Sequence, residues 1–339
     1  MVNNGAPRKW ARNLIGPALA ARRRHGPPPS YRRERWDTPD GDFIDVDWLG
    51  EPGHGRPTLV LFHGLEGSSL SHYAVAFADW AREQGLSYAV AHFRGCSGEI
   101  NLAPRSYHSG DHAEIDWILR RAAHRAGPLF VVGVSLGGNM LLRWAEEQRE
   151  GAARIARAVA AVCAPLDLAA GARAIARGLN KPFYTRMFLA TMKPKALEKL
   201  AQFPGIASRE RILAARSIRD FDDAFTAPLH GFASADDYYR QCSSRWRLAD
   251  IAIPTLVLNP RNDPFVPAAS LPSRAEAGAH VTLWQPAHGV AAWRPSSANA
   301  VVACWGGPNV VGAKPPTVWQ VAHSPAARAA NSPAWRSAG

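Results

Sequence analysis

The 339-residue sequence lacks the marks of membrane proteins and of metal proteins. No run reaches eighteen apolar residues, so no transmembrane helix is predicted. The only cysteines, Cys96, Cys163, Cys242 and Cys304, form no CxxC pair and no metal-ligand spacing, so we expect no metal and no cofactor. Free thiols favour a cytoplasmic protein. No secretory signal is predicted, because the short apolar stretch at 14–21 is broken by Pro17 and is followed by three arginines, where a signal needs small residues.

Acidic residues are missing from the C-terminal part of the chain. Residues 277–339 contain four Lys or Arg and no Asp or Glu, and residues 1–36 contain nine Lys or Arg and one acid. The two ends therefore account for the whole net charge of +12. Because a nucleic-acid-binding domain carries its basic patch on the folded body, no nucleic-acid partner is expected. The basic arm could make a weak contact with an anionic membrane surface, although a solvated tail is the simpler interpretation.

Short apolar runs alternate with amphipathic patterns through much of the chain, which favours a mostly parallel sheet with helices on both faces. Residues 37–49 predict a half-buried strand in a hairpin with 31–36. The predicted buried strands are 57–62, 87–92, 129–134, 158–163, 253–259 and 281–284, and the helices 71–84, 110–125 and 138–148. The predicted class is therefore α/β.

Residues 166–248 interrupt this alternation, because their pattern is helical and polar and contains no convincing strand. A helical insert after a sheet strand is typical of a cap. Large apolar side chains in the insert either control the entry of acyl chains or dock the insert on the core: Phe183, Tyr184, Met187 and Phe188. The predicted parts are a basic arm (1–30), a first core part (31–165), a helical cap (166–248), a closing core part (249–289) and an atypical tail (290–339).

A G-x-S-x-G sequence at 133–137 follows a predicted buried strand and precedes a predicted helix. This context is typical of a nucleophile elbow, with Ser135 as the nucleophile on a turn so tight that it requires Gly133 and Gly137. The helix N-terminus behind the serine favours negative charge. A glycine-rich turn that binds nothing, or that binds a phosphate, is the alternative.

Acyl transfer creates an oxyanion, which backbone N–H groups can stabilise. The residue after the nucleophile, Leu136, is one expected donor. The second donor is expected in the loop after an earlier strand, where His63-Gly64-Leu65-Glu66-Gly67 stands, and Leu65 is the natural candidate. His63 follows a buried strand directly, so we expect it to hold this loop by a hydrogen bond.

An orienting acid and a base complete a hydrolase triad, in the chain order Ser, Asp or Glu, His. Asp263 follows the strand at 253–259 and stands at a sheet edge where ligand chemistry is common. Its alternative role is an Asx turn before Pro264. His288 is the candidate base, because it is the histidine near enough to the loop after the last strand.

These residues together resemble the YheT-like branch of the α/β-hydrolases, AB hydrolase family 4. The resemblance covers roughly residues 31–288 and lies in FHGLEGS (62–68), HFRGCSGE (92–99), YHSGD (107–111), GVSLGGNM (133–140), TAPLHGFASADDYYRQCSS (226–244) and LNPRNDPF (258–265). It implies a Ser-Asp-His hydrolase of esterase or lipase type that acts on a small-molecule ester or a lipid, with Ser135 and Asp263 at the matching positions.

The end of the chain departs from that family, which continues with a motif resembling HGGHVGF. His288 matches the first histidine, and Ala291 stands where the catalytic histidine is implied. The acid-free tail that follows indicates a shifted reading frame. The alternatives are therefore a catalytically impaired protein that binds an acyl ligand or a partner, and a thioesterase or peptidase on the same fold.

Overall fold

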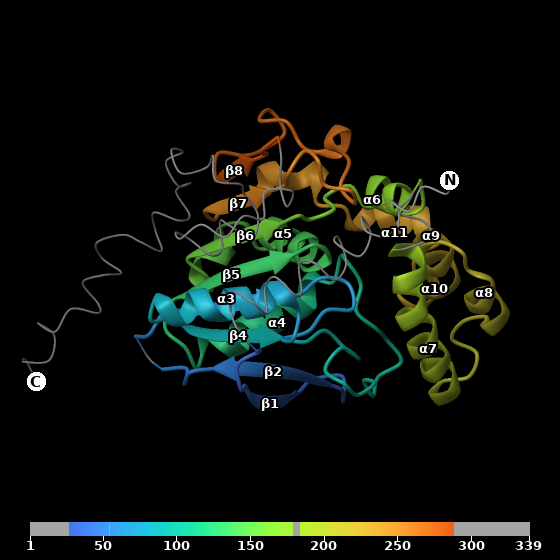
Figure 1. The fold of residues 1–339 in the computed structure, drawn as a ribbon, viewed down its shortest axis with the longest axis horizontal. Coiled ribbons are helices and arrows are strands. Elements are labelled where there is room, and N and C mark those ends of the chain that lie inside the picture. The colour runs from blue at the N-terminus through green and yellow to red at the C-terminus, as the bar shows by residue number, and fades with distance from the viewer. Residues whose placement is uncertain (1–26, 54, 179–183, 288–339) are drawn as a thin grey trace, which may run out of the picture.

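The computed structural model describes residues 27–53, 55–178 and 184–287. These residues form an eight-stranded sheet in the order β1-β2-β4-β3-β5-β6-β7-β8 (Figure 1). The first two strands pair antiparallel, β2 pairs antiparallel with β4, and all other pairs are parallel. The predicted α/β class is confirmed. The strands are β1 (Arg32–Asp37), β2 (Phe43–Leu49), β3 (Thr58–Phe62), β4 (Ser87–Ala91), β5 (Leu129–Val134), β6 (Ala158–Val162), β7 (Thr255–Leu258) and β8 (Val281–Trp284).

Helices cover both faces of the sheet, because side chains alternate along each buried strand. On β3, Val60 and Phe62 belong to one apolar cluster, which contains residues of the helices α4 (His112–Ala123) and α5 (Leu136–Gln148). Leu61 belongs to the other cluster, with Phe77 of α3 (His72–Glu83). The predicted layers are confirmed. Short 3-10 helices at Arg149–Arg154 and Ala268–Ser270 follow α5 and β7.

The hairpin of β1 and β2 differs from its prediction. The alternation in β2 predicted a half-buried strand, but each of its residues except the last is buried. Asp45 and Asp47 explain the difference, because Arg35 and Arg33 of β1 bind their carboxylates at 2.8 and 2.7 Å. A strand with carboxylates can lie within the molecule when each charge has a hydrogen-bonded partner.

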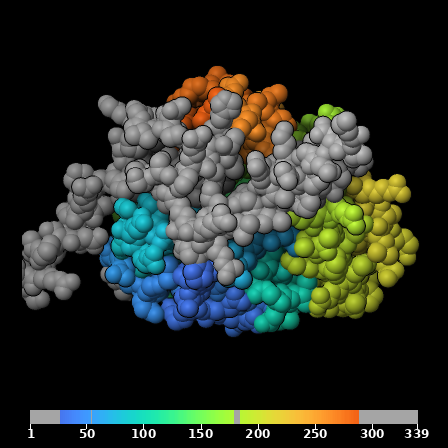
Figure 2. All heavy atoms as spheres, viewed as in Figure 1, coloured from blue at the N-terminus to red at the C-terminus, as the bar shows by residue number. Residues whose placement is uncertain are grey.

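The segment between β6 and β7 is helical in its described residues. It forms a lobe at one end of the molecule, seen in yellow-green in Figure 2. Part of it has a small apolar core of its own, around Ile212, Phe221 and Phe225. Its elements are α6 (Leu168–Ile175), α7 (Arg186–Gln202), α8 (Arg209–Ala214), α9 (Ile218–Phe221), the π-helix η3 (Asp222–Thr226), α10 (Ala227–Leu229), α11 (Ala235–Cys242) and the 3-10 helix η4 (Arg245–Asp250). We call this segment the helical insert; its role as a cap stays a prediction.

Among the described residues, no helix has both the length and the apolar character needed to cross a bilayer.

Candidate active site

Ser135 lies between β5 and α5, with backbone angles of φ 54° and ψ −120°. Its N–H donates to the carbonyl of Val162 at the end of the neighbouring strand, at 2.8 Å. Its side chain makes no capping hydrogen bond to α5. The hydroxyl therefore lies at a helix N-terminus but caps none of its N–H groups. The backbone conformation of Ser135 costs conformational free energy for a residue with a side chain.

Two glycines make this turn possible. A Cβ atom on Gly133 would lie 2.4 Å from the carbonyl oxygen of Gly137, and one on Gly137 would lie 2.4 Å from the carbonyl oxygen of His63. Both contacts are with backbone atoms, which cannot rotate away. The spacing of the G-x-S-x-G sequence thus follows from the close approach of three backbone segments. α5 begins at Leu136, two residues before its predicted start.

The loop after β3 passes beside the serine, since a Cβ on Gly64 would lie 3.2 Å from the Cβ of Ser135. The N–H of Gly64 donates to the hydroxyl of Tyr73 at 2.9 Å, and the N–H of Glu66 donates to the hydroxyl of Tyr107 at 3.0 Å. Between them, the N–H of Leu65 has no hydrogen-bond partner in the described part of the chain.

The N–H of Leu136 is the first of α5, so no carbonyl of the helix can accept from it. Leu65 and Leu136 line the same pocket. This arrangement offers two backbone donors to an oxyanion.

His63 holds the loop from below and is fully buried. Its Nε2 accepts from the N–H of Phe93 at 3.1 Å, so its Nδ1 carries the proton and donates to the carbonyl of Gly64 at 2.8 Å. Burial lowers the pKa of His63 to about 3, so the ring is neutral. These two bonds are the structural role expected for this histidine.

Asp263 follows β7 and lies at the same sheet edge as Ser135, two strands away. Its Oδ1 accepts the N–H groups of Phe265 and Val266 at 2.8 and 3.2 Å. The Asx turn that was the alternative role of this residue is therefore present, and it holds the carboxyl group in place. Burial raises the pKa of Asp263. Its place in a triad stays a prediction.

Cys163 is a neighbour of Asp263 that the sequence did not single out. It follows β6, the strand between β5 and β7, with a φ of 49°. Its thiol is hydrogen-bonded to the carboxyl group of Asp263, and burial, followed by this carboxylate, raises the pKa of the thiol. The thiol is thus protonated and can donate to the carboxylate. A cysteine after a buried strand has no sequence feature that marks this role.

His288, the predicted base, and Ala291 lie outside the described residues, as do Cys304 and the atypical tail. The described residues contain no group of three or more His, Cys, Asp or Glu side chains arranged to hold a metal ion.

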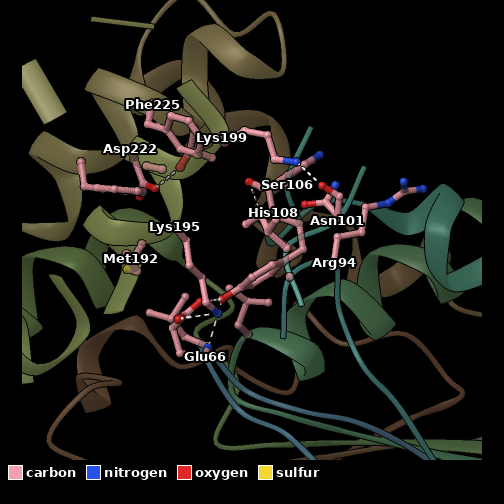
Figure 3. A pocket seen from close by; sticks show the side chains of 18 of the residues that line it. Glu66, Arg94, Asn101, Ser106, His108, Met192, Lys195, Lys199, Asp222 and Phe225 are labelled. Carbon is pink, nitrogen blue, oxygen red and sulfur yellow. Dashed lines mark hydrogen bonds and ion pairs between the residues drawn. The ribbon is translucent and has the colours of Figure 1, made fainter. Parts of the chain in front are cut away.

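A pocket opens between the loop of Leu65 and the helical insert (Figure 3). From the insert, Met192, Phe221 and Phe225 line it with apolar surface. Of the four apolar residues singled out in the sequence, the three that the structure describes do not line the pocket. Tyr184 packs edge-on against Phe265 at 4.5 Å, Phe188 packs against the insert's own core, Met187 is exposed, and Phe183 lies outside the described residues.

The pocket face of α7 follows helical spacing, since residues 192, 195, 196 and 199 all line the pocket. This spacing was present in the sequence. Only the packed structure distinguishes this face of the helix from the others.

The sequence was compared with family models and with known proteins. The family model described as "alpha/beta hydrolase fold" matches residues 57–289. The chain belongs to the α/β-hydrolase family. The Escherichia coli protein named "Putative esterase YheT" is 41% identical over 245 residues, which are 70% of this chain and 71% of that protein. The predicted resemblance to the YheT-like branch is confirmed.

More distant relatives of this α/β-hydrolase have other names. Mouse "Phospholipase ABHD3" is 29% identical over 78% of this chain and 66% of its own length. The "Monoacylglycerol lipase" of Saccharomyces cerevisiae is 25% identical over 69% of this chain. The alignment covers 53% of the yeast protein. Among solved structures, mouse alpha/beta hydrolase domain-containing protein 10 aligns with a TM-score of 0.49 at 15% identity, over 76% of this chain and 90% of that one.

Proposed function

We propose that this α/β-hydrolase is a serine hydrolase of carboxylic esters, with Ser135 as its nucleophile. One observation carries the proposal. Ser135 stands in a strained turn at a helix N-terminus, beside two backbone N–H groups, of Leu65 and Leu136, that are available to an oxyanion. Strain of this kind persists at functional sites, where the surrounding structure maintains it. The names of the relatives, which include an esterase, a phospholipase and a monoacylglycerol lipase, agree with ester chemistry.

In the proposed reaction, the hydroxyl oxygen of Ser135 attacks the ester carbonyl and its proton passes to the imidazole of a histidine base, for which His288 is the candidate in the sequence although Ala291 stands at the position the family resemblance implies. The carbonyl oxygen becomes an oxyanion that accepts from Leu65 and Leu136. The C–O bond to the alcohol then breaks, and the alcohol leaves with the proton from the imidazole. Water hydrolyses the acyl-serine in the same two steps. Asp263 orients the imidazole and stabilises its charged form.

The substrate class that fits is a carboxylic ester with an apolar acyl group, as in a short-chain carboxylesterase or a monoacylglycerol lipase. The pocket begins at the proposed oxyanion hole, and the side chains of Ile100, Met192 and Phe225 give it apolar walls. An acyl chain that enters there would place its carbonyl carbon beside Ser135. Burial of apolar chain surface provides about 25 cal/mol per Å².

The test is the Ser135→Ala variant with p-nitrophenyl butyrate as substrate. We expect the rate to fall by roughly 10³-fold or more, because loss of a triad member costs several orders of magnitude. The far-UV circular dichroism spectrum should be unchanged. Ser208→Ala is the control, since it removes the N-cap of α8 and no residue of the proposed site.

Two further measurements belong to the same experiment. A fluorophosphonate probe should label the wild type and leave Ser135→Ala unlabelled. The His288→Ala variant tests the base: if His288 serves, this variant loses activity as Ser135→Ala does. Hydrolysis by Ser135→Ala at the wild-type rate would refute the proposed nucleophile.

A further inference from the structure

Helix α7 of the insert is attached to the core by two lysines on its pocket face. The ammonium group of Lys195 binds a carboxylate oxygen of Glu66 at 2.8 Å. One turn further along, Lys199 donates to the carbonyls of Asn101 and Ala103. Both lysines line the pocket, and Figure 3 shows Lys195 extending across to Glu66. The insert therefore contacts two separate core loops across the pocket.

Glu66 is the residue after Leu65, the proposed oxyanion donor. Its φ of 56° lies in the left-handed region, which a glutamate rarely adopts without support. The support comes from Tyr107, whose hydroxyl accepts from the N–H of Glu66 at 3.0 Å and donates to its Oε1 at 2.8 Å. Lys195 binds the other carboxylate oxygen. The conformation of the loop at Leu65 thus depends on one side chain from the insert and one from the core.

The ion pair of Lys195 and Glu66 is partly shielded from water, and Lys195 stays charged in it. The side chain of Glu66 is 11% exposed and that of Lys195 is 35% exposed, so water screens the contact only in part. Burial alone would lower the pKa of Lys195, but Cys96 and Glu66 outweigh it and raise the pKa, so the ammonium group stays charged. Lys195 lies almost 130 residues from Glu66 in the chain. The contact exists only while α7 is seated on the core.

We propose that Lys195 is a positioning residue: its ion pair with Glu66 holds the loop that presents the Leu65 N–H, so that the oxyanion hole is complete when α7 is seated. The proposal rests on the proposed hydrolase function in that it assigns Leu65 as an oxyanion donor. The coupling between the insert and the loop does not depend on that assignment. An acyl group in the pocket would contact α7 and the oxyanion loop together, so the same seating would form the pocket wall and the donor geometry.

The first experiment measures the loop without any reaction. Amide hydrogen exchange is followed by mass spectrometry over residues 62–68 in the wild type and in Lys195→Met. The variant keeps most of the aliphatic length of the side chain and removes its charge. We expect exchange of the Glu66 and Gly67 amides to accelerate at least threefold. Lys193→Met is the matched control, because Lys193 is on the same helix and donates to the carbonyl of Leu213 outside the pocket.

The second experiment measures catalysis with p-nitrophenyl butyrate. Lys195→Met should lower kcat by roughly tenfold or more with a smaller change in KM, because a displaced donor weakens binding of the oxyanion more than binding of the ester. Lys195→Arg keeps the charge and should recover most of kcat. Lys195→Met in a Glu66→Gln background should cause no further loss, since the partner is already absent.

The outcomes separate the two proposals. Unchanged exchange over 62–68 in Lys195→Met, or equal acceleration in Lys193→Met, overturns the positioning role even if the enzyme is active. A KM change with constant kcat, or additive losses in the double variant, also overturns it. Faster exchange in Lys195→Met, in a protein whose wild type neither hydrolyses esters nor reacts with a fluorophosphonate, supports the coupling and overturns the proposed function.

Discussion

Replacement of Ser135 by glycine should stabilise the protein while it removes the proposed nucleophile. Ser135 has φ 54° and ψ −120°, a combination that costs a residue with a Cβ atom about 1–3 kcal/mol. Glycine adopts these angles without that penalty, but its greater freedom in the unfolded chain costs about 0.5–1 kcal/mol. The serine side chain caps no N–H of α5, so no hydrogen bond to the helix is lost. The net expectation is a gain of about 1 kcal/mol in the free energy of unfolding.

Urea unfolding of the wild type, Ser135→Ala and Ser135→Gly measures this effect on the free energy of unfolding. Ser135→Ala keeps the Cβ atom, so its free energy of unfolding should stay within about 0.5 kcal/mol of wild type. The free energy of unfolding of Ser135→Gly should exceed that of both other proteins, and its melting temperature should be roughly 2–4 °C higher. Arg149→Gly is a positive control at the other end of α5. Arg149 has φ 47° and ψ −127°, and its contact with Asp250, at 3.8 Å, is exposed and weak.

The comparison is designed so that a single result refutes the reasoning. If Ser135→Gly is no more stable than Ser135→Ala, while Arg149→Gly shows the expected gain, then the elbow stores no strain in its backbone. Both serine variants should fail to react with a fluorophosphonate. Reaction in either one would place the nucleophile elsewhere.

Two further predictions concern the contacts that join the insert to the core and the interior of the insert. Asn139 is fully buried, donates to the carbonyls of Ser109 and Cys242 and accepts from the N–H of Ser244, so Asn139→Ala should cost about 2–4 kcal/mol in urea unfolding; a cost below about 1 kcal/mol would contradict this. Burial raises the pKa of Asp222 to about 6, so the folded state holds its proton more tightly than the unfolded state does. The stability from this group is complete below about pH 4 and is lost as the pH rises through 6, so between pH 4 and 8 the wild type should lose roughly 3 kcal/mol relative to Asp222→Asn. Parallel pH profiles of the two proteins would refute the assignment, and the exposed ion pair of Asp223 makes Asp223→Asn the control.

The order of strands and helices, and the elbow, were determined by the sequence itself. Buried parallel strands are continuous apolar runs, and helices between them repeat every three to four residues, so both are local patterns. Gly133 and Gly137 flank Ser135 because other backbone atoms occupy the space that a Cβ would need at these positions. The sequence therefore contains a glycine two residues before and two residues after the serine, and this spacing can be recognised without the structure. Leu65 and Leu136 could be named for the same reason, since an N–H after a strand or at a helix start depends on local position.

Tertiary structure alone decided which distant residues meet. Asp45 and Asp47 look solvent-exposed in a strand pattern, but the fold brings them the arginines of the paired strand, and brings Asp47 also the side chains of Ser69 and His92. Lys195 looks like one of many surface lysines until α7 is seated beside Glu66. The thiol of Cys163 reaches Asp263 because β6 lies next to β7, although a hundred residues separate the two in the chain. Such contacts form when the whole core packs, and a packed contact between distant segments leaves no periodicity in either of them.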